Sequence, residues 1–273
     1  MSRFTARAKE LFSAVKTGDP IARLDRSVDA ETLWPGTLEQ AAEYAASILR
    51  SFFFDGFIVP YRTLGVCDQQ IIKKCHGLAV FHLLRDGLNS PTANGNGVLI
   101  TRLPDGKWSG ASAILIDNNT PFPSGVDVMD VVLVINDKHA MDTLMDDTVA
   151  VSKCLTVAPG AIPQSETQTS QSLHGPPDQA QVWSYAKSKG ELVEFDLGSI
   201  VIREEATQNE TFYGIAGISR REILSGQVKT PSIRNHLSST VDQLDKQTGS
   251  LSGLPRPGRC PGDCRVKVAS NKN

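Results

Sequence analysis

Histidine, cysteine and aspartate side chains are the groups in this chain that could bind a metal or attack a substrate. The histidines are far apart, and His76 and His82, six residues apart, would lie on different faces of a helix. Cys260 and Cys264 form a single CxxxC pair with no second ligand pair nearby, a spacing that rarely binds zinc on its own. The sequence therefore predicts no zinc site.

Six aspartates gather between residues 127 and 147. They are Asp127, Asp130, Asp137, Asp142, Asp146 and Asp147. The cluster lacks the regular spacing of oxygen ligands and the central glycine of an EF-hand loop. We interpret it as a solvated acidic face, with a loose divalent-cation site as the alternative.

Catalytic motifs are missing from the sequence. It contains no GxSxG nucleophile elbow, GxxxxGK[ST] phosphate loop, HExxH zinc motif or GxGxxG dinucleotide fingerprint. Cys67 and Cys75 have no histidine and asparagine arranged around them as a cysteine nucleophile would need. We therefore expect a protein that is not an enzyme and that requires neither a cofactor nor a metal.

The first sixteen residues carry a different chemistry, that of a lipid-binding helix. Apolar residues recur at helical spacing among four basic residues and one acidic residue. A basic amphipathic helix of this kind can lie in a lipid interface. Docking on the body of the protein and mitochondrial targeting are the alternatives. The predicted lipid contacts are Phe4, Arg7, Lys9, Leu11 and Phe12, with Lys73 and Lys74 on a predicted helix and Lys187 and Lys189 in a predicted turn as secondary candidates.

Charge is distributed unevenly along the 273 residues. Residues 38–228 carry 14 basic and 22 acidic side chains, a net charge of −8, whereas residues 229–273 carry 8 and 3, a net charge of +5. The total of −2 does not indicate a nucleic-acid partner. No run approaches the ~18–20 apolar residues of a membrane span, and no secretory signal is recognisable. Five scattered cysteines fit a reducing compartment better than a disulfide framework.

The first elements needed to position these groups are helices. Residues 38–54 have an apolar stripe at helical spacing, and Thr37 is a suitable N-cap. Residues 68–86 are long enough for a second helix, although Gly77 weakens it and a break there into a helix and a strand is the alternative. We predict a turn at residues 94–97, where the sequence is Asn-Gly-Asn-Gly.

The remainder of residues 38–228 is typical of β-structure. Short strands flank the turn at Pro104–Lys107, and residues 126–135 have the apolar content of a central strand. Asn136 is predicted to cap a short helix that ends near Met145. Residues 192–202 are predicted to form a strand paired with residues 182–186, before a last helical turn at residues 218–224. We expect an exposed loop at residues 159–180 and a disordered basic tail at residues 229–273.

These elements predict an α+β protein with N-terminal helices packed on a mostly antiparallel, twisted β-sheet or sandwich. The predicted divisions are an amphipathic segment and linker at residues 1–37, a folded domain at residues 38–228 and the tail at residues 229–273.

One segment resembles the signature of a known family. Residues 97–113, GVLITRLPDGKWSGASA, are similar to the core of the SYLF domain, in which an arginine precedes D-G-x-W-S. Residues 39–52, 71–80, 125–136 and 182–190 resemble other family segments in the right order, so the resemblance covers about residues 38–228. The glycine-rich run that many members have before a central strand is replaced here by residues 117–123, DNNTPFP.

The resemblance implies a cytoplasmic, non-enzymatic domain that binds phosphoinositide-containing membranes peripherally. In fungal and animal members this property is often joined to actin-filament binding at endocytic or ruffling sites. Membrane contact in such relatives often involves a basic amphipathic N-terminal segment. Many fungal relatives also carry a C-terminal Src-homology-three domain, and none is recognisable in residues 229–273.

Two functions follow as hypotheses. The first is a phosphoinositide- and membrane-binding module in membrane-associated actin or endocytic regulation. The second is an actin-filament-binding scaffold with only secondary lipid contact. Nucleic acid is not an expected partner of either.

Overall fold

The computed structural model describes residues 36–55, 57–58, 64–65, 67, 69–86, 92–118, 126–160, 180–188, 191–192, 200–231 and 236–246. The predicted lipid contacts Phe4, Arg7, Lys9, Leu11 and Phe12 lie outside this set, as do Lys189, Cys260 and Cys264 and most of the predicted loop.

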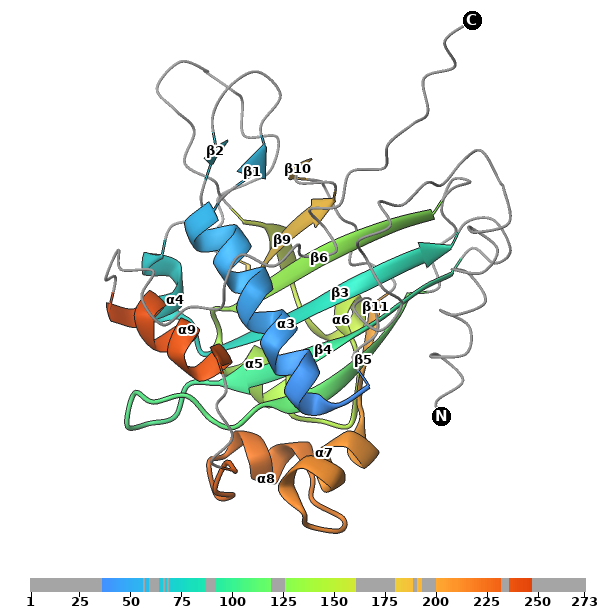
Figure 1. Ribbon diagram of the computed structural model, residues 1–273, viewed down its shortest axis with the longest axis vertical. Coiled ribbons are helices and arrows are strands. Elements are labelled where there is room, and N and C mark those ends of the chain that lie inside the picture. The colour runs from blue at the N-terminus through green and yellow to red at the C-terminus, as the bar shows by residue number, and fades with distance from the viewer. Residues whose placement is uncertain are drawn as a thin grey trace, which may run out of the picture.

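A curled β-sheet forms the centre of the described structure (Figure 1). Its strand order is β10-β9-β6-β3-β4-β5-β11-β7, and neighbours on this path are antiparallel. The short strand β8 pairs with β9 in parallel. The strands are β3 (Gly77–Asp86), β4 (Thr92–Thr101), β5 (Ser112–Asn118), β6 (Val126–Ile135), β7 (Thr148–Ala150), β8 (Val157–Pro159), β9 (Val182–Ser188), β10 (Glu191–Leu192) and β11 (Ile200–Glu204).

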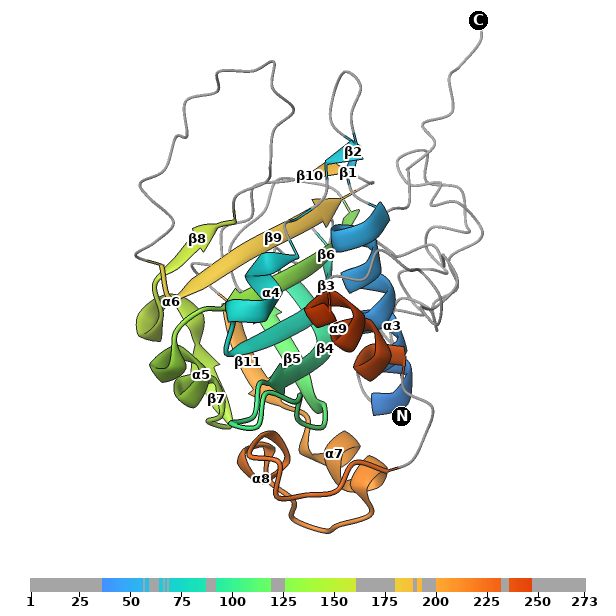
Figure 2. The ribbon, with the colours of Figure 1, turned by 90° about the vertical axis from the view of Figure 1, so that its left-hand side faces the viewer.

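Helices cover both faces of this sheet (Figure 2). They are α3 (Leu38–Arg50), α4 (Gln70–Lys74), α5 (Lys138–Leu144), α6 (Val151–Cys154), α7 (Ala206–Tyr213), α8 (Arg220–Leu224) and α9 (His236–Lys246). A two-stranded ribbon, β1 (Phe57–Ile58) and β2 (Leu64–Gly65), forms a sheet of its own beside β10. This arrangement confirms the predicted α+β class. Among the described helices, none has the length and apolar content needed to cross a membrane.

The sheet is buried on both faces because successive side chains of a strand point in opposite directions. Val80, Val98 and Val132 belong to the core that also includes α3. Phe81 and Leu133 belong to a second core, on the face that carries α5. The continuous apolar sequence of β6 follows from this double burial.

Helix α3 lies across the long strands and begins as predicted, with the hydroxyl of Thr37 accepting a hydrogen bond from the main-chain N–H of Gln40. At its other end the chain forms a π-helical turn, Ser51–Asp55. The carbonyl oxygens of this turn accept hydrogen bonds from outside the helix: Ser51 from Lys187 Nζ, Phe52 from the N–H of Cys67, and Phe53 from Gln69 Nε2. These donors hold the turn in place of regular α-helical bonds.

Residues 68–86 adopt the alternative that the sequence left open, with α4 followed by strand β3. Gly77 is the first residue of β3. Glycine fits there because a Cβ atom would collide with the sulfur of Met141 and would lie 2.8 Å from the carbonyl oxygen of Ile100.

The predicted turn at residues 94–97 is wrong. These residues continue strand β4, in register with residues 81–84 of β3. A Cβ atom at Gly95 or Gly97 would collide with the carbonyl oxygen of His82 or Val80. The glycines allow two strands to approach closely rather than the chain to reverse.

Two further predictions need correction. The N-cap of α5 is Asp137, whose carboxylate accepts from the N–H of Ala140, and not Asn136. The predicted strand at residues 192–202 is divided, because β10 pairs with β9 whereas β11 lies at the far side of the sheet between β5 and β7.

The predicted disordered tail is corrected at residues 236–246, which form α9. Its apolar side chains Leu237, Val241 and Leu244 are buried in the core that contains α3. Their i, i+4, i+7 spacing gives the helix one apolar stripe, which is stable only because α3 and α4 cover it.

Candidate functional site

The connection between β4 and β5 is a tight turn that contains the most specific motif of the sequence. Gly106 has φ of +83°, a conformation that favours glycine. The N–H of Gly106 donates to the carbonyl of Leu103, and the N–H of Lys107 donates to the carboxylate of Asp105. The hydrogen bond from the main-chain N–H of Lys107 is the main reason that the pKa of Asp105 lies below its usual value. The turn brings Arg102 and Trp108 opposite one another as a β-bridge.

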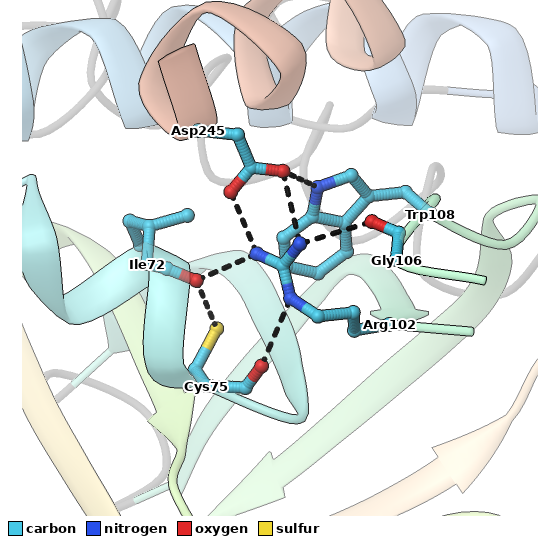
Figure 3. A network of polar contacts seen from close by, with 6 residues as sticks. All are labelled: Ile72, Cys75, Arg102, Gly106, Trp108 and Asp245. Atoms are coloured by element: carbon cyan, nitrogen blue, oxygen red, sulfur yellow. Dashed lines mark hydrogen bonds and ion pairs between the residues drawn. The ribbon is translucent and has the colours of Figure 1, made fainter. Parts of the chain in front are cut away.

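Arg102 uses all five of its N–H donors (Figure 3). Nε donates to the carbonyl of Cys75 at 3.2 Å, Nη2 to the carbonyl of Ile72 at 2.7 Å and Nη1 to the carbonyl of Gly106 at 3.1 Å. The remaining two donors bind the carboxylate of Asp245, at 2.6 Å and 3.0 Å. One side chain thus joins the end of α4, the turn and α9.

Asp245 receives a third donor from Trp108, whose Nε1 lies 2.9 Å from Oδ2. The guanidinium of Arg102 also stacks over the Trp108 ring, 4.4 Å from its centroid. Burial lowers the pKa of Arg102, but the hydrogen bond and negative charge of Asp245 outweigh burial, and the pKa lies above its usual value. The arrangement is a carboxylate receptor with three converging donors.

Exposed lysines surround this junction. Lys73 and Lys74 lie between the two α4-end carbonyls that Arg102 binds, Lys107 follows Gly106, and Lys246 follows Asp245. All four are exposed, and Lys107 is paired with Asp105 at 3.0 Å. We call these residues the lysine cluster: Lys73, Lys74, Lys107 and Lys246. The hydrogen bonds from Arg102 to the carbonyls of Ile72 and Cys75 therefore hold the main chain on both sides of the predicted contacts Lys73 and Lys74.

Lys187 is not the exposed turn lysine that the sequence indicated. It lies in β9, its side chain is buried, and its Nζ donates to the carbonyl of Ser51 at 3.3 Å. It therefore cannot contact a membrane surface in this structure.

The six aspartates of the acidic cluster do not form one site. Asp130 is buried in the sheet, Asp137 caps α5, and Asp146 pairs with Arg221 at 2.8 Å. Within the described ranges, no group of three or more His, Cys, Asp or Glu residues is placed to hold a metal ion. Cys67 and Cys75 are buried, and burial raises the pKa of the Cys75 thiol to about 12.

Asp245 was not among the residues predicted from the sequence, because it lies in the predicted tail. Two signals were present in the sequence: the apolar spacing of residues 237, 241 and 244, and the arginine and tryptophan of the signature, which need a partner when half-buried.

Known proteins resemble this chain over most of its length. SH3 domain-containing YSC84-like protein 1 of Rattus norvegicus is 30% identical over 265 residues, which cover 88% of this chain and 76% of the rat protein. The family described as Ysc84, Las17-binding protein actin regulator, matches residues 120–244. This chain belongs to the Ysc84 (SYLF) family.

Ysc84-family relatives in yeast are longer than the matched region. Protein YSC84 of Saccharomyces cerevisiae is 30% identical over 203 residues, 72% of this chain and 42% of the yeast protein. LAS seventeen-binding protein 3 of the same species gives the same identity and coverage. The match therefore spans less than half of these yeast proteins. No solved structure matches this chain.

The Ysc84 match extends to residue 244 and so includes most of α9. The family region thus continues beyond residue 228, the predicted end of the domain. The SYLF signature, residues 97–113, lies before the matched range and includes Arg102 and Trp108, which bind Asp245.

Proposed function

We propose that this chain is a phosphoinositide- and membrane-binding module that acts in membrane-associated actin or endocytic regulation. Its place would be cytoplasmic, peripheral at membranes or actin patches. The observation that carries the proposal is the lysine cluster, in which four exposed lysines are next in sequence to residues that Arg102 binds.

Binding to an anionic membrane requires local clusters of basic residues in this chain. Residues 38–228 carry a net charge of −8, so the body as a whole is repelled by an anionic leaflet. Each lysine or arginine close to an anionic leaflet contributes about 1 kcal/mol. The N-terminal segment would add further contacts. Its basic residues Arg7 and Lys9 would bind anionic headgroups, and its apolar residues Phe4, Leu11 and Phe12 would insert among the lipids.

Vesicle co-sedimentation of the full chain tests this proposal. Vesicles with and without phosphoinositide are compared for the wild type, K73E/K74E and R7E/K9E. Because each variant removes two cations, we expect affinity to fall by about 30-fold or more in each. The matched control is K153E/K229E, which reverses two exposed lysines on α6 and after α8.

A wild type that does not sediment with phosphoinositide vesicles would contradict the proposal. Equal losses in all three variants would show a general charge effect and no site. A loss confined to R7E/K9E would assign the contact to residues 1–16 alone.

The second candidate function is actin-filament binding with secondary lipid contact. The family description, an actin regulator, favours it. Co-sedimentation with actin filaments at physiological salt and without lipid separates the two. Pelleting under those conditions supports the scaffold, and its absence rejects filament binding by this chain.

A further inference from the structure

Helix α9 is attached to the domain by a distinct set of contacts. Leu237, Val241 and Leu244 are buried along one stripe. At the first turn, the N–H of His236 donates to Glu43 Oε1 at 3.1 Å, and its ring contacts the other oxygen of the same carboxylate. At the last turn, Asp245 binds Arg102 and Trp108.

Helix α9 packs mainly on other helices. It packs on α3 and α4, and Figure 2 shows it beside α3 on the same side of the sheet. Because no hydrogen bond of the sheet involves α9, its departure would leave every strand pair intact. An isolated helix of 11 residues is marginal in water, so α9 would lose its helical structure when it leaves.

The surface beneath α9 is chemically specific. It consists of the α9-facing sides of α3 and α4, with Glu43 at one end and Arg102 with Trp108 at the other. We call it the α9-docking surface. It binds an apolar stripe along its middle and a carboxylate at its far end, where three donors converge within 3.0 Å. This combination matches helix-in-groove recognition, with the carboxylate fixing direction and register.

We infer that α9 is a releasable latch and that the α9-docking surface accepts, in its place, an acidic amphipathic helix of a protein partner. The partner helix carries apolar residues at positions i, i+4 and i+7, an aspartate or glutamate at i+8 and a basic residue at i−1. The acidic residue at i+8 meets Arg102, and the basic residue at i−1 meets Glu43.

Residues 1–16 do not fit this pattern. Aligning Phe4 with Leu237 places Phe12 at the position of Asp245 and Arg7 at the position of Thr240, which is buried in α9. That segment would leave Arg102 without its carboxylate. An anionic membrane fits less well too, because the ligand on Arg102 and Trp108 is a carboxylate borne on an amphipathic helix. An anionic membrane repels such a carboxylate.

Hydrogen exchange and peptide binding test the inference on the full chain. Exchange is followed by mass spectrometry in α9 and in β3 and β6 for the wild type, D245N and D242N. Asp242 lies on the same helix and is exposed, so D242N is the matched control. A labelled peptide with residues 236–246, HLSSTVDQLDK, is then titrated into each protein, together with a peptide in which asparagine replaces Asp245.

The expected result is local opening. In the wild type, α9 should exchange at least tenfold faster than β3 and β6. D245N should speed exchange of α9 by about tenfold or more, since charged hydrogen bonds are lost, and leave the strands unchanged. The labelled peptide should bind D245N at least tenfold more tightly than the wild type or D242N, and the asparagine peptide should bind weakly.

Three results would overturn the inference. The first is exchange of α9 together with β3 and β6 in the wild type, which does not depend on any variant folding. The second is equal peptide binding by all three proteins. The third is a D245N protein that binds phosphoinositide vesicles more tightly but not the peptide, which would assign the uncovered surface to a membrane. Because neither peptide binding nor exchange involves lipid, the first two results are independent of the proposed membrane function.

Discussion

Asp130 of β6 and Lys187 of β9 are cross-strand neighbours, and both side chains are fully buried on the α3 face of the sheet. The next two strands continue the row, with His82 opposite Asp130 and Asn96 opposite His82. The ring of Tyr44 from α3 meets His82 edge-on, with centroids 6.1 Å apart. Four polar residues therefore form a row across the sheet beneath α3, with one acid and one base side by side.

The burial of this acid and base predicts that the two charges are coupled. Lys187→Met should lower the free energy of unfolding by about 3–5 kcal/mol, because Asp130 would remain as a buried charge without its neighbouring cation. The double variant D130N/K187M should be more stable than K187M. Urea unfolding of the three proteins measures this, and a double variant no more stable than K187M would contradict coupling.

The five donors of Arg102 predict that lysine cannot replace it. Lysine keeps the charge but has only three donors, so at least two charged hydrogen bonds are lost in R102K. We expect a loss of about 3 kcal/mol or more in the free energy of unfolding. R203K is the control, since Arg203 makes a more exposed ion pair with Asp117 at 2.6 Å and should change stability by less than about 1 kcal/mol. Similar losses of unfolding free energy in R102K and R203K would contradict a special role for the hydrogen bonds of Arg102.

Two glycines of the signature region should respond differently to alanine. At Gly97 the new Cβ would collide with the main chain of β3, so G97A should unfold the protein or cost about 4 kcal/mol or more. At Gly106 nothing lies within 4 Å, and only the φ of +83° opposes the substitution, so G106A should cost about 1–2 kcal/mol. Thermal unfolding ranks the two, and the reverse order would contradict the close approach of β3 and β4.

Cysteine reactivity should follow burial. Because the pKa of Cys75 is raised to about 12, its thiol stays protonated at pH 8, and burial raises the pKa of Cys67 as well. The thiolate is the reactive form, so both should resist iodoacetamide in the folded protein. Cys154 is exposed and should be labelled. Peptide mass spectrometry identifies the modified residues, and rapid labelling of Cys75 at pH 8 would show that the junction opens.

Local sequence determined several elements of this protein. The stripe and cap of α3, the Pro104–Lys107 turn and strand β6 follow from spacing and turn chemistry over a few residues. The SYLF resemblance also came from contiguous residues. In each case the physical signal lies within one element, so no knowledge of distant partners was needed.

Other features were decided by partners far away in the chain. The Asn-Gly-Asn-Gly segment has the composition of a turn, yet it is a strand because β3 runs against it. Lys187 was predicted in a turn, yet it is buried in strand β9, where Asp130 lies opposite it and the carbonyl of Ser51 accepts its hydrogen bond. Residues 236–246 are too short and polar to form a helix alone, and they do so because α3, α4 and Arg102 supply an apolar surface and a cation for Asp245. Burial and long-range pairing belong to the assembled structure, and for that reason only the tertiary fold reveals the junction of Arg102, Trp108 and Asp245.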